Sequence, residues 1–341
     1  MRTPAIRSRV LSTSNELFRL SHEWHVLWTR CPGASTFQRP EWLLAWAAAF
    51  LPHGVRAIEF RRDSELVGLA PLLIYPREHE QVLAFMGGGV SDYLDLLAHP
   101  SWEQEIVGAF REVILRQPDW TLLDLTDLPG ESVLLKDAFR NFVQPHDTCL
   151  ALELPATTDE LLQLLSKRQR ANLRNARSRL QSAGGGEVQL ASAATLADFL
   201  QDLFRLHTER WSKLGAPGVL SDERIQFFHS DLAPRLLDCG CLRIYRLVSS
   251  GRTLAVIEAF FEAETAFCYM QGFDPEFSYL SPGTQLMFAI MNEAVRAGVR
   301  KFDFLRGQES YKAHWHTQPE RTLRITVSRS QLASISRQAA A

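Results

Sequence analysis

Four side chains in the C-terminal half could do acid–base chemistry. Glu258 lies in the apolar run AVIEAFF of a predicted strand, where burial would raise the pKa of its carboxyl group toward the range of a general base. Strand alternation places it on one face with Val256 and Phe260, and an outward-facing position is the equally supported alternative. His207 lies on a predicted helix over 196–214, with an ordinary structural histidine as its alternative. The candidate acid–base groups are Glu258, His207, Asp303 and Tyr311.

A turn between a predicted strand and a predicted helix offers an anion site. The segment FDPEFSYLSPGT leads into a helix over 283–297, and the free N–H groups and the dipole of a helix N-terminus favour negative charge. The Pro282-Gly283 turn has no side chain that would block a phosphate. The alternative is a plain helix cap in which Ser281 or Thr284 supplies the capping oxygen. The cofactor-binding candidates are Ser281, Pro282, Gly283, Thr284 and Gln285.

Positive charge is concentrated on one predicted helix and after one predicted strand. The helix over 160–181 brings four cations together beside an apolar stripe, so this face is either solvated or an anion-binding surface in which Arg170 is paired. These four are Lys167, Arg170, Arg174 and Arg177. After the strand over 301–305, a guanidinium and an ammonium could hold a phosphate or a carboxylate, and a solvated lysine is the equal alternative. The substrate-binding candidates are Arg170, Arg306, Gly307 and Lys312.

The elements that must position these groups occur in the same order in both halves of the chain. A hairpin is followed by a further strand, a long helix and a short strand, which has the sequence LLDL (122–125) in the first half and KFDFL (301–305) in the second. This order predicts one internal repeat, and therefore an α/β chain of two similar modules over 14–154 and 155–330. We expect the tail after Ser330 and the first dozen residues to be frayed.

Composition excludes several classes of protein. With 37 Lys and Arg against 39 Asp and Glu, the net charge of −2 argues against non-specific nucleic-acid binding by the whole chain, so no DNA partner is expected. The longest apolar run, Trp42–Leu51, is too short to span a bilayer, and the N-terminus lacks the apolar segment of a secretory signal. The five cysteines include no Cys-X-X-Cys pair, and His314-Trp315-His316 lacks a third ligand at the usual spacing, so we expect neither a disulfide framework nor a metal. A cytoplasmic protein without a membrane span is the expectation.

Several of these segments together resemble a known family. They are SPGTxL at 281–286, AGVxxFDFLRG at 297–307, the Tyr311-Lys312 pair, SKRQRANLRNAR at 166–177 and LHxxRW at 206–211. The set resembles the CelD-like branch of the GNAT acyltransferases, which is associated with cellulose and exopolysaccharide biosynthesis and is related to the FemAB-like transferases. It implies two tandem GNAT-like modules with mixed central sheets, of which the second carries the acyl-carrier site.

The resemblance implies transfer of an acyl group from acyl-CoA, with acetyl-CoA preferred, to an amine or hydroxyl of a small-molecule or saccharide acceptor. The turn at 281–285 matches the place where GNAT proteins hold the donor's pyrophosphate. The usual loop Q/R-x-x-G-x-G/A is absent, so CoA, an acyl carrier protein and an aminoacyl-tRNA stay open as donors. The family motif D-x-x-R-G matches Asp303, Arg306 and Gly307. The alternatives are a FemAB-like aminoacyl transferase, whose basic helix would bind tRNA phosphates, and a non-catalytic scaffold of polysaccharide synthesis.

Overall fold

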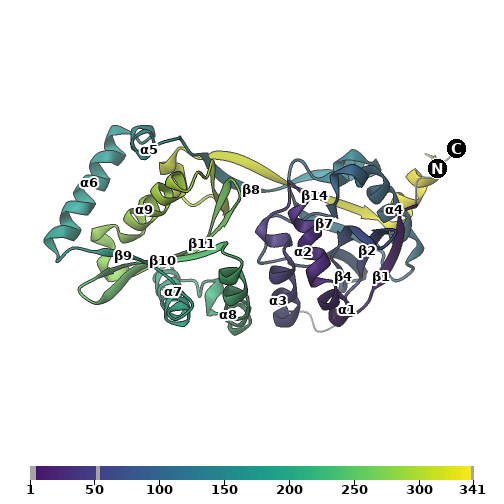
Figure 1. Ribbon diagram of the computed structural model, residues 1–341, viewed down its shortest axis with the longest axis horizontal. Helices are drawn as coiled ribbons and strands as arrows, with labels where there is room; N and C mark the ends of the chain where they lie inside the picture. The colour runs from purple at the N-terminus through teal and green to yellow at the C-terminus, as the bar shows by residue number, and fades with distance from the viewer. Residues whose placement is uncertain (1–4, 51–53, 339–341) are drawn as a thin grey trace. The chain divides into compact units, whose positions relative to one another are not determined.

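The computed structural model describes residues 5–50 and 54–338, which form two compact units (Figure 1). Unit 1 consists of the described residues up to Asp147 and of those from Arg321 onward. Unit 2 is Thr148–Glu320. These boundaries differ from the expected modules over 14–154 and 155–330. The physical reason is that the last strand of the chain pairs with a strand of unit 1 and so completes its sheet.

Unit 1 is an α/β module with one parallel strand pair. Its helices are α1 (Ser14–Arg19), α2 (Ser21–Thr29), α3 (Pro40–Phe50), α4 (Glu103–Arg116) and α10 (Arg329–Gln338). Its strands are β1 (Arg7–Leu11), β2 (Ala57–Arg62), β3 (Glu65–Ala70), β4 (Leu72–Arg77), β5 (Glu80–Phe85), β6 (Leu97–Ala98), β7 (Leu122–Leu128) and β14 (Gln318–Ser328). They are ordered β1-β2-β3-β6 in one sheet and β4-β5-β7-β14 in another, where β5 and β7 are parallel.

Unit 2 is a second α/β module with the same kind of mixed sheet. Its helices are α5 (Thr158–Leu164), α6 (Lys167–Ser182), α7 (Leu196–Lys213), α8 (Glu223–Asp238) and α9 (Pro282–Arg296). Its strands are β8 (Val143–Glu153), β9 (Glu187–Leu190), β10 (Leu242–Ser249), β11 (Arg252–Glu262), β12 (Thr265–Phe273) and β13 (Lys301–Arg306). Their order is β8-β13-β12-β11-β10-β9, with only β12 and β13 paired in parallel among these described strands. Helices α7 and α8 cover one face of this sheet and α9 covers the other (Figure 1).

The internal repeat predicted from the sequence is confirmed by the strand pairing. In unit 1, β5 is connected through α4 to the parallel strand β7, which then pairs antiparallel with β14. In unit 2, β12 is connected through α9 to the parallel strand β13, which then pairs antiparallel with β8. A β-α-β crossover needs a helix because parallel strands cannot be joined by a tight turn. In both units the chain therefore passes from one parallel strand to the next through a helix.

Several predicted elements differ from the observed ones for local reasons. The helix expected over 160–181 is two helices, because Ser166 starts α6 with a capping box in which its side chain accepts from the Gln169 amide. The apolar run over 65–75, whose composition predicts one continuous strand, divides at Pro71 into β3 and β4, which belong to different sheets. The expected fraying of the termini is wrong for the described residues. There the chain forms β1, which pairs with β2, and α10.

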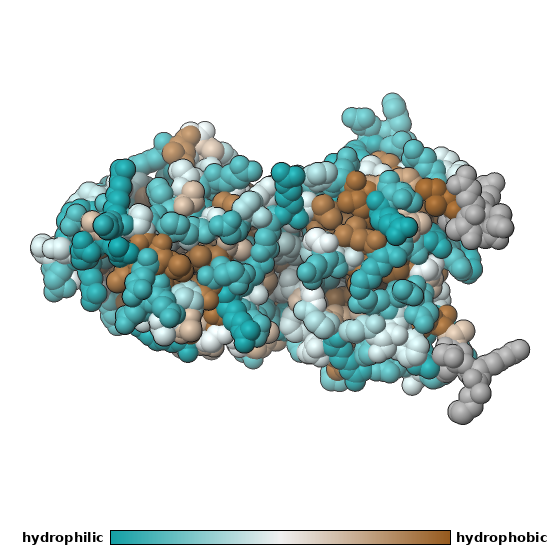
Figure 2. Space-filling model, turned by 90° about the horizontal axis from the view of Figure 1, so that it is seen from above, coloured by the Kyte–Doolittle hydropathy of each residue, from teal (hydrophilic) through white to brown (hydrophobic). Residues whose placement is uncertain are grey.

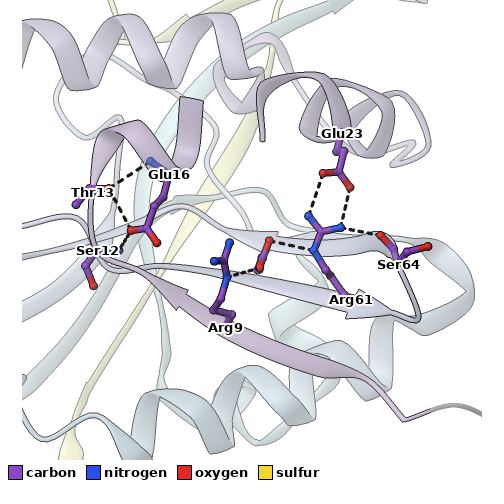
Figure 3. A network of polar contacts seen from close by, with 8 residues as sticks. Arg9, Ser12, Thr13, Glu16, Glu23, Arg61 and Ser64 are labelled. Atoms are coloured by element: carbon purple, nitrogen blue, oxygen red, sulfur yellow. Dashed lines mark hydrogen bonds and ion pairs between the residues drawn. The ribbon is translucent and has the colours of Figure 1, made fainter. Parts of the chain in front are cut away.

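A network of charges attaches the N-terminal strand of unit 1 to a helix (Figure 3). Arg9 on β1 donates to Glu59 on β2 over 2.6 Å, and Arg61 donates to the other oxygen of Glu59 over 3.1 Å. Arg61 also forms a two-pronged pair with Glu23 of α2, at 2.7 and 3.0 Å. The hydrogen bonds from Arg61 hold the pKa of the Glu23 carboxyl below its usual value. This network explains why a terminal segment expected to fray is ordered.

The core of unit 2 positions the N-terminus of α9. Buried residues recur along α9 with helical spacing, so one side of the helix packs on the sheet. They include Leu286, Met287, Ile290, Met291 and Ala294. The same core contains Ile257 and Cys268 from neighbouring strands. Burial of this side fixes the direction of the helix, and the first turn of α9 lies beyond the end of β12.

Candidate functional site

Strands β12 and β13 are paired over only part of their length. The parallel ladder joins Thr265–Phe267 to Lys301–Asp303, and the described residues contain no further ladder pair between the two strands. On its other side β12 pairs with β11 through to Phe273, with a bulge at Tyr269. No described strand therefore pairs with the β13-facing edge of 268–273. A free strand edge of this kind can accept an extended, amide-containing ligand by main-chain hydrogen bonds.

A cavity of about 270 Å³ lies at the N-terminus of α9. Its walls come from α6, from the first turn of α9 and from the short helix η7 (Lys312–Trp315). The lining residues are Leu165, Gln169, Asn172, Leu173, Asn175, Ala176, Arg179, Ser281, Thr284, His314 and Trp315. The lining combines amide, hydroxyl and guanidinium groups with apolar side chains, which suits a ligand that is polar at one end and apolar elsewhere.

The first turn of α9 leaves backbone donors at this cavity. Ser281 precedes the helix with a left-handed φ of 51°, and its side chain makes no capping hydrogen bond. The first helical hydrogen bond runs from the Gln285 amide to Ser281 O, so the amides of Gly283 and Thr284 have no partner within the helix. An added Cβ on Gly283 would meet nothing nearer than the Phe273 ring at 3.8 Å. The capping alternative for Ser281 is thus not observed, and the turn can approach an anion closely.

Gln285 has a different role from the one expected. Its side-chain amide donates to Ala176 O over 3.2 Å and to Leu280 O over 2.7 Å. Those two hydrogen bonds hold α6 against the start of α9 and use both amide hydrogens. The Gln285 side chain therefore builds the cavity wall instead of contacting a cofactor. Pro282 is buried beside it and contributes no N–H.

The segment after β13 is organised around a buried lysine. Lys312 is 2% exposed, and its ammonium donates to Arg306 O at 2.7 Å, Gly307 O at 3.2 Å and Leu305 O at 3.3 Å. It also pairs with Glu309 at 2.9 Å. An ammonium has three hydrogens, and these acceptors use them all. The expected free charge for a substrate phosphate is thus corrected: Lys312 holds the backbone of the loop.

Asp303 belongs to the same loop. Its carboxylate is fully buried and accepts the Leu305 amide over 2.7 Å. Leu305 and Gly307 both have left-handed backbone, with φ of 59° and 107°. This conformation is costly for leucine, so the Asp303 and Lys312 contacts are what keep it. The D-x-x-R-G motif therefore determines the backbone conformation at the end of β13. The half-buried side chain of Arg306 is attached at this turn.

Tyr311 lies beside a cation that the candidate list omitted. Gln271 of β12 donates to the Tyr311 hydroxyl. The Arg210 guanidinium of α7 lies 5.2 Å from the Phe273 ring centre and 6.0 Å from that of Tyr311. Burial raises the pKa of Tyr311 well above 10, so its phenol keeps its proton at neutral pH. Arg210 belongs to the LHxxRW segment. It follows His207 by about one helical turn, and this spacing could have identified it as a candidate site residue.

Glu258 is inward-facing, as one of the two alternatives predicted. The carboxylate is 1% exposed, and one of its oxygens lies 3.0 Å from Nδ1 of His229, which is completely buried on α8. The His229 ring packs against Phe228 and Tyr269. Neither Glu258 nor His229 lines the cavity at α9. His229 could not be identified from the sequence, because a histidine on the apolar side of an amphipathic helix has no special spacing.

His207 is buried on α7, directly against β12. Its backbone N would lie 2.5 Å from a Cβ added to Gly272, so helix and strand backbones touch at this point. Burial lowers the pKa of His207 to about 4, and Arg210 and His229 act in the same direction. The Nδ1 atom has no hydrogen-bond partner within the described chain. His207 is thus a neutral imidazole at neutral pH.

This pKa predicts a pH dependence of stability. The unfolded state, with a His pKa near 6.5, binds more protons than the folded state between pH 6.5 and about 4. The free energy of unfolding should therefore fall as the pH is lowered through that window, by up to about 1.4 kcal/mol per pH unit from this group. In His207→Gln this contribution disappears. Urea unfolding of the wild type and of His207→Gln at pH 6.5, 5.5 and 4.5 measures how steeply the free energy of unfolding of each protein depends on pH. An equal dependence in the two proteins would contradict the assignment.

Arg170 is paired, but not with a substrate or a carboxylate. Its guanidinium donates to Leu165 O over 2.8 Å and to Gln163 O over 3.1 Å. These carbonyls belong to the end of α5, where helical partners are missing. Arg170 therefore caps α5 and fixes the joint between α5 and α6. This corrects its expected role as a substrate contact.

Within 5–50 and 54–338, no three His, Cys, Asp or Glu side chains are grouped so that they could hold a metal ion. Over the same ranges, no helix has the length and apolar content that crossing a bilayer requires.

Residues 167–313, which lie within unit 2, match the family model described as an acetyltransferase (GNAT) domain. Among solved structures, the fold is similar to that of FemX, with a TM-score of 0.65 and 12% identity over 93% of this chain and 96% of that one. It is also similar to the C-terminal domain of a putative lysylphosphatidylglycerol synthetase from Agrobacterium fabrum, with a TM-score of 0.57 and 11% identity over 92% of each chain. L-PGS from Bacillus licheniformis gives a TM-score of 0.56 and 13% identity over 89% of this chain and 91% of that one. No curated protein matches the sequence.

Proposed function

We propose that this chain is an acyltransferase that takes an acyl group from acyl-CoA, with acetyl-CoA the preferred donor, and passes it to an amine or hydroxyl. The observation that carries the proposal is the divergence of β12 from β13 next to an α9 N-terminus that opens into a cavity. The donor's phosphates would bind the Gly283 and Thr284 amides, with Arg179 adding charge. Its amide-containing arm would pair with the free edge of β12.

The proposed step is direct attack of the acceptor on the thioester. A carbon–nitrogen or carbon–oxygen bond forms, the carbon–sulfur bond breaks, and the acceptor's proton goes to the leaving thiolate. The phenol of Tyr311 keeps its proton at neutral pH and is the group we assign to stabilise that thiolate. An acyl-enzyme on Cys268 is disfavoured, because burial raises the pKa of this thiol to about 12.

For the acceptor we propose a chemical class only. The resemblance of 166–327 to the CelD-like branch supports a small-molecule or saccharide acceptor in exopolysaccharide synthesis. Glu258 and His229 form a buried pair away from the cavity, so we assign Glu258 a positioning role for β11 in place of the general base. Native mass spectrometry of the purified chain tests the donor. A bound mass equal to CoA or an acyl-CoA supports the proposal, and a chain that neither carries nor takes up CoA refutes it.

Gly283→Val should weaken CoA binding at least about tenfold, or about 1.4 kcal/mol. The valine side chain would stand where the backbone approaches the phosphate. Folding should change by less than about 0.5 kcal/mol, because the added Cβ enters open space and φ is not left-handed. Calorimetry with CoA measures the affinity, and Gly88→Val, also at an open position, is the control. An unchanged CoA affinity in Gly283→Val would mean that the turn serves folding only.

A second candidate function is aminoacyl transfer from tRNA. The observation that favours it is the set of unpaired cations on α6, described below. Retention of tRNA that weakens steeply with salt, together with no CoA binding, would select this function over the first.

A further inference from the structure

Helix α6 is the most one-sidedly charged element of the described chain. Its sequence, KRQRANLRNARSRLQS, contains six cations and no acidic residue. Arg170 is used internally, on the carbonyls that end α5. The other five side chains are exposed, and none of them forms an ion pair within the described residues. They are Lys167, Arg168, Arg174, Arg177 and Arg179.

The electrostatic repulsion within this set of cations destabilises α6. Arg170, Arg174 and Arg177 follow one another at spacings of four and three residues, which places like charges side by side. Lys167 and Arg168 lie in the first turn, where the positive end of the helix dipole disfavours cations. No acidic residue in that turn offsets them. An anionic partner that binds this helix would therefore relieve the repulsion and stabilise it.

Helix α6 forms one wall of the cavity at α9. Arg179 and Asn175 line the cavity, whereas Arg174 and Arg177 lie on the side of the same helix that faces away from it and are exposed. In Figure 2 the end of the molecule that contains α6 is covered mostly by hydrophilic side chains. A partner that binds the exposed side of α6 would therefore be separated from the proposed donor site by about one helix diameter, roughly 10 Å.

Exposed apolar side chains occur on the elements next to α6. Leu162 and Leu164, from the last turn of α5, are 39% and 43% exposed, and Tyr279 is 59% exposed on η6 (Pro275–Leu280), which contacts α6. Protein interfaces combine arginines with apolar and aromatic contacts, whereas phosphate tracking on a nucleic acid needs the cations alone. An interfacial lipid-binding helix would present large apolar residues on its own exposed side. The exposed side of α6 has none: it carries Lys167, Arg174, Asn175 and Ser178.

We propose that α6 is the docking surface for an acidic acyl carrier protein, whose phosphopantetheine arm delivers the thioester to the cavity. The inference rests on the proposed thioester chemistry and adds a carrier-protein-bound acyl group as a second donor beside acyl-CoA. Charge complementarity would speed encounter and set orientation, and the exposed leucines of α5 would be buried in the contact. CoA, which has the same arm but no protein, would reach the cavity without using Arg174 or Arg177.

The test is a double charge reversal, Arg174→Glu with Arg177→Glu. The control reverses two exposed cations on other helices of unit 2, Lys213→Glu with Arg296→Glu. Surface plasmon resonance measures binding of purified holo acyl carrier protein at 50 and 300 mM salt, and calorimetry measures CoA. We expect the wild type to bind the carrier, more weakly at high salt, and the α6 variant to lose at least tenfold. The control variant should bind the carrier normally, CoA affinity should be unchanged in every variant, and the α6 variant should melt no lower than the wild type.

Three results would overturn the proposal: no carrier binding by the wild type, equal binding by the α6 variant, or equal loss in the control. Parallel samples contain total tRNA or vesicles with anionic phosphatidylglycerol. Binding of either probe in place of the carrier, lost in the α6 variant, would assign the face to nucleic acid or membrane instead. CoA binding distinguishes a failure of this inference from a failure of the proposed function. A wild type that binds CoA but no carrier refutes only this inference, and one that binds neither refutes the thioester function as well.

Discussion

Lys312→Met should destabilise unit 2 by about 3 kcal/mol and remove the shape of the loop after β13. The ammonium of Lys312 satisfies three backbone carbonyls in a buried position, and methionine fills the volume without donating to them. Buried acceptors left without a donor cost about 1–3 kcal/mol each, partly relieved by water. The left-handed residues Leu305 and Gly307 would lose the contacts that hold them. Urea unfolding measures the loss of stability, and hydrogen exchange at 305–307 measures the loss of order.

Two further variants separate this account from a simple effect of charge. Lys213→Met removes an exposed ammonium from the same unit and should change stability by less than about 0.5 kcal/mol. Lys312→Arg should not restore the wild type, because a planar guanidinium cannot direct its donors at three carbonyls around one point. Wild-type stability and wild-type exchange at the loop in Lys312→Met would contradict the structural role assigned to Lys312.

Gly272→Ala should cost about 2–3 kcal/mol, the largest effect we expect from one added methyl group. The new Cβ would lie 2.5 Å from the His207 N and 2.7 Å from the Leu206 carbonyl carbon. Both atoms are backbone, so α7 must move away from β12, and rearrangements of this kind typically cost about 1–3 kcal/mol or more. The movement would also displace Arg210, one turn further along α7, from Phe273 and Tyr311.

Gly283→Ala is the matched control in the same unit. Its Cβ would meet only the Phe273 ring, at 3.8 Å, so stability should be unchanged or slightly raised. Thermal unfolding of the two variants beside the wild type provides the comparison. If Gly272→Ala and Gly283→Ala melt together, the close approach of α7 and β12 is not a constraint on the fold.

Local patterns predicted the elements that local forces decide. The observed bounds of α7, α9 and β13 agree with those expected to within one residue, because apolar spacing and turn residues determine both ends. The division between α5 and α6 was missed, although the Ser166 capping box is visible in the sequence, because the apolar stripe continues across it. The unit boundary was missed for a different reason. The return of 321–328 to β7 is a pairing over nearly two hundred residues, and no local pattern encodes it.

The candidate site was predicted in part. The SPGT turn does lie at a cavity, since a strand followed by a tight turn and a helix fixes backbone geometry by itself. The roles of charged side chains were less predictable. Lys312 and Arg170 both bind carbonyls, and the carbonyl partners of a cation carry no signature in the sequence. The Glu258 and His229 pair joins β11 to α8 across the module, so only the folded chain brings it together.

Hydrogen exchange of the whole chain, with and without saturating CoA, tests the central claim most directly. The account predicts that CoA slows exchange at the start of α9, over 281–286, and along the free edge of β12, over 268–273, while unit 1 is unchanged. Gly283→Val should reduce this protection at the same CoA concentration. Protection that is absent from both segments, or that appears only in unit 1, would contradict a thioester donor bound where β12 and β13 diverge.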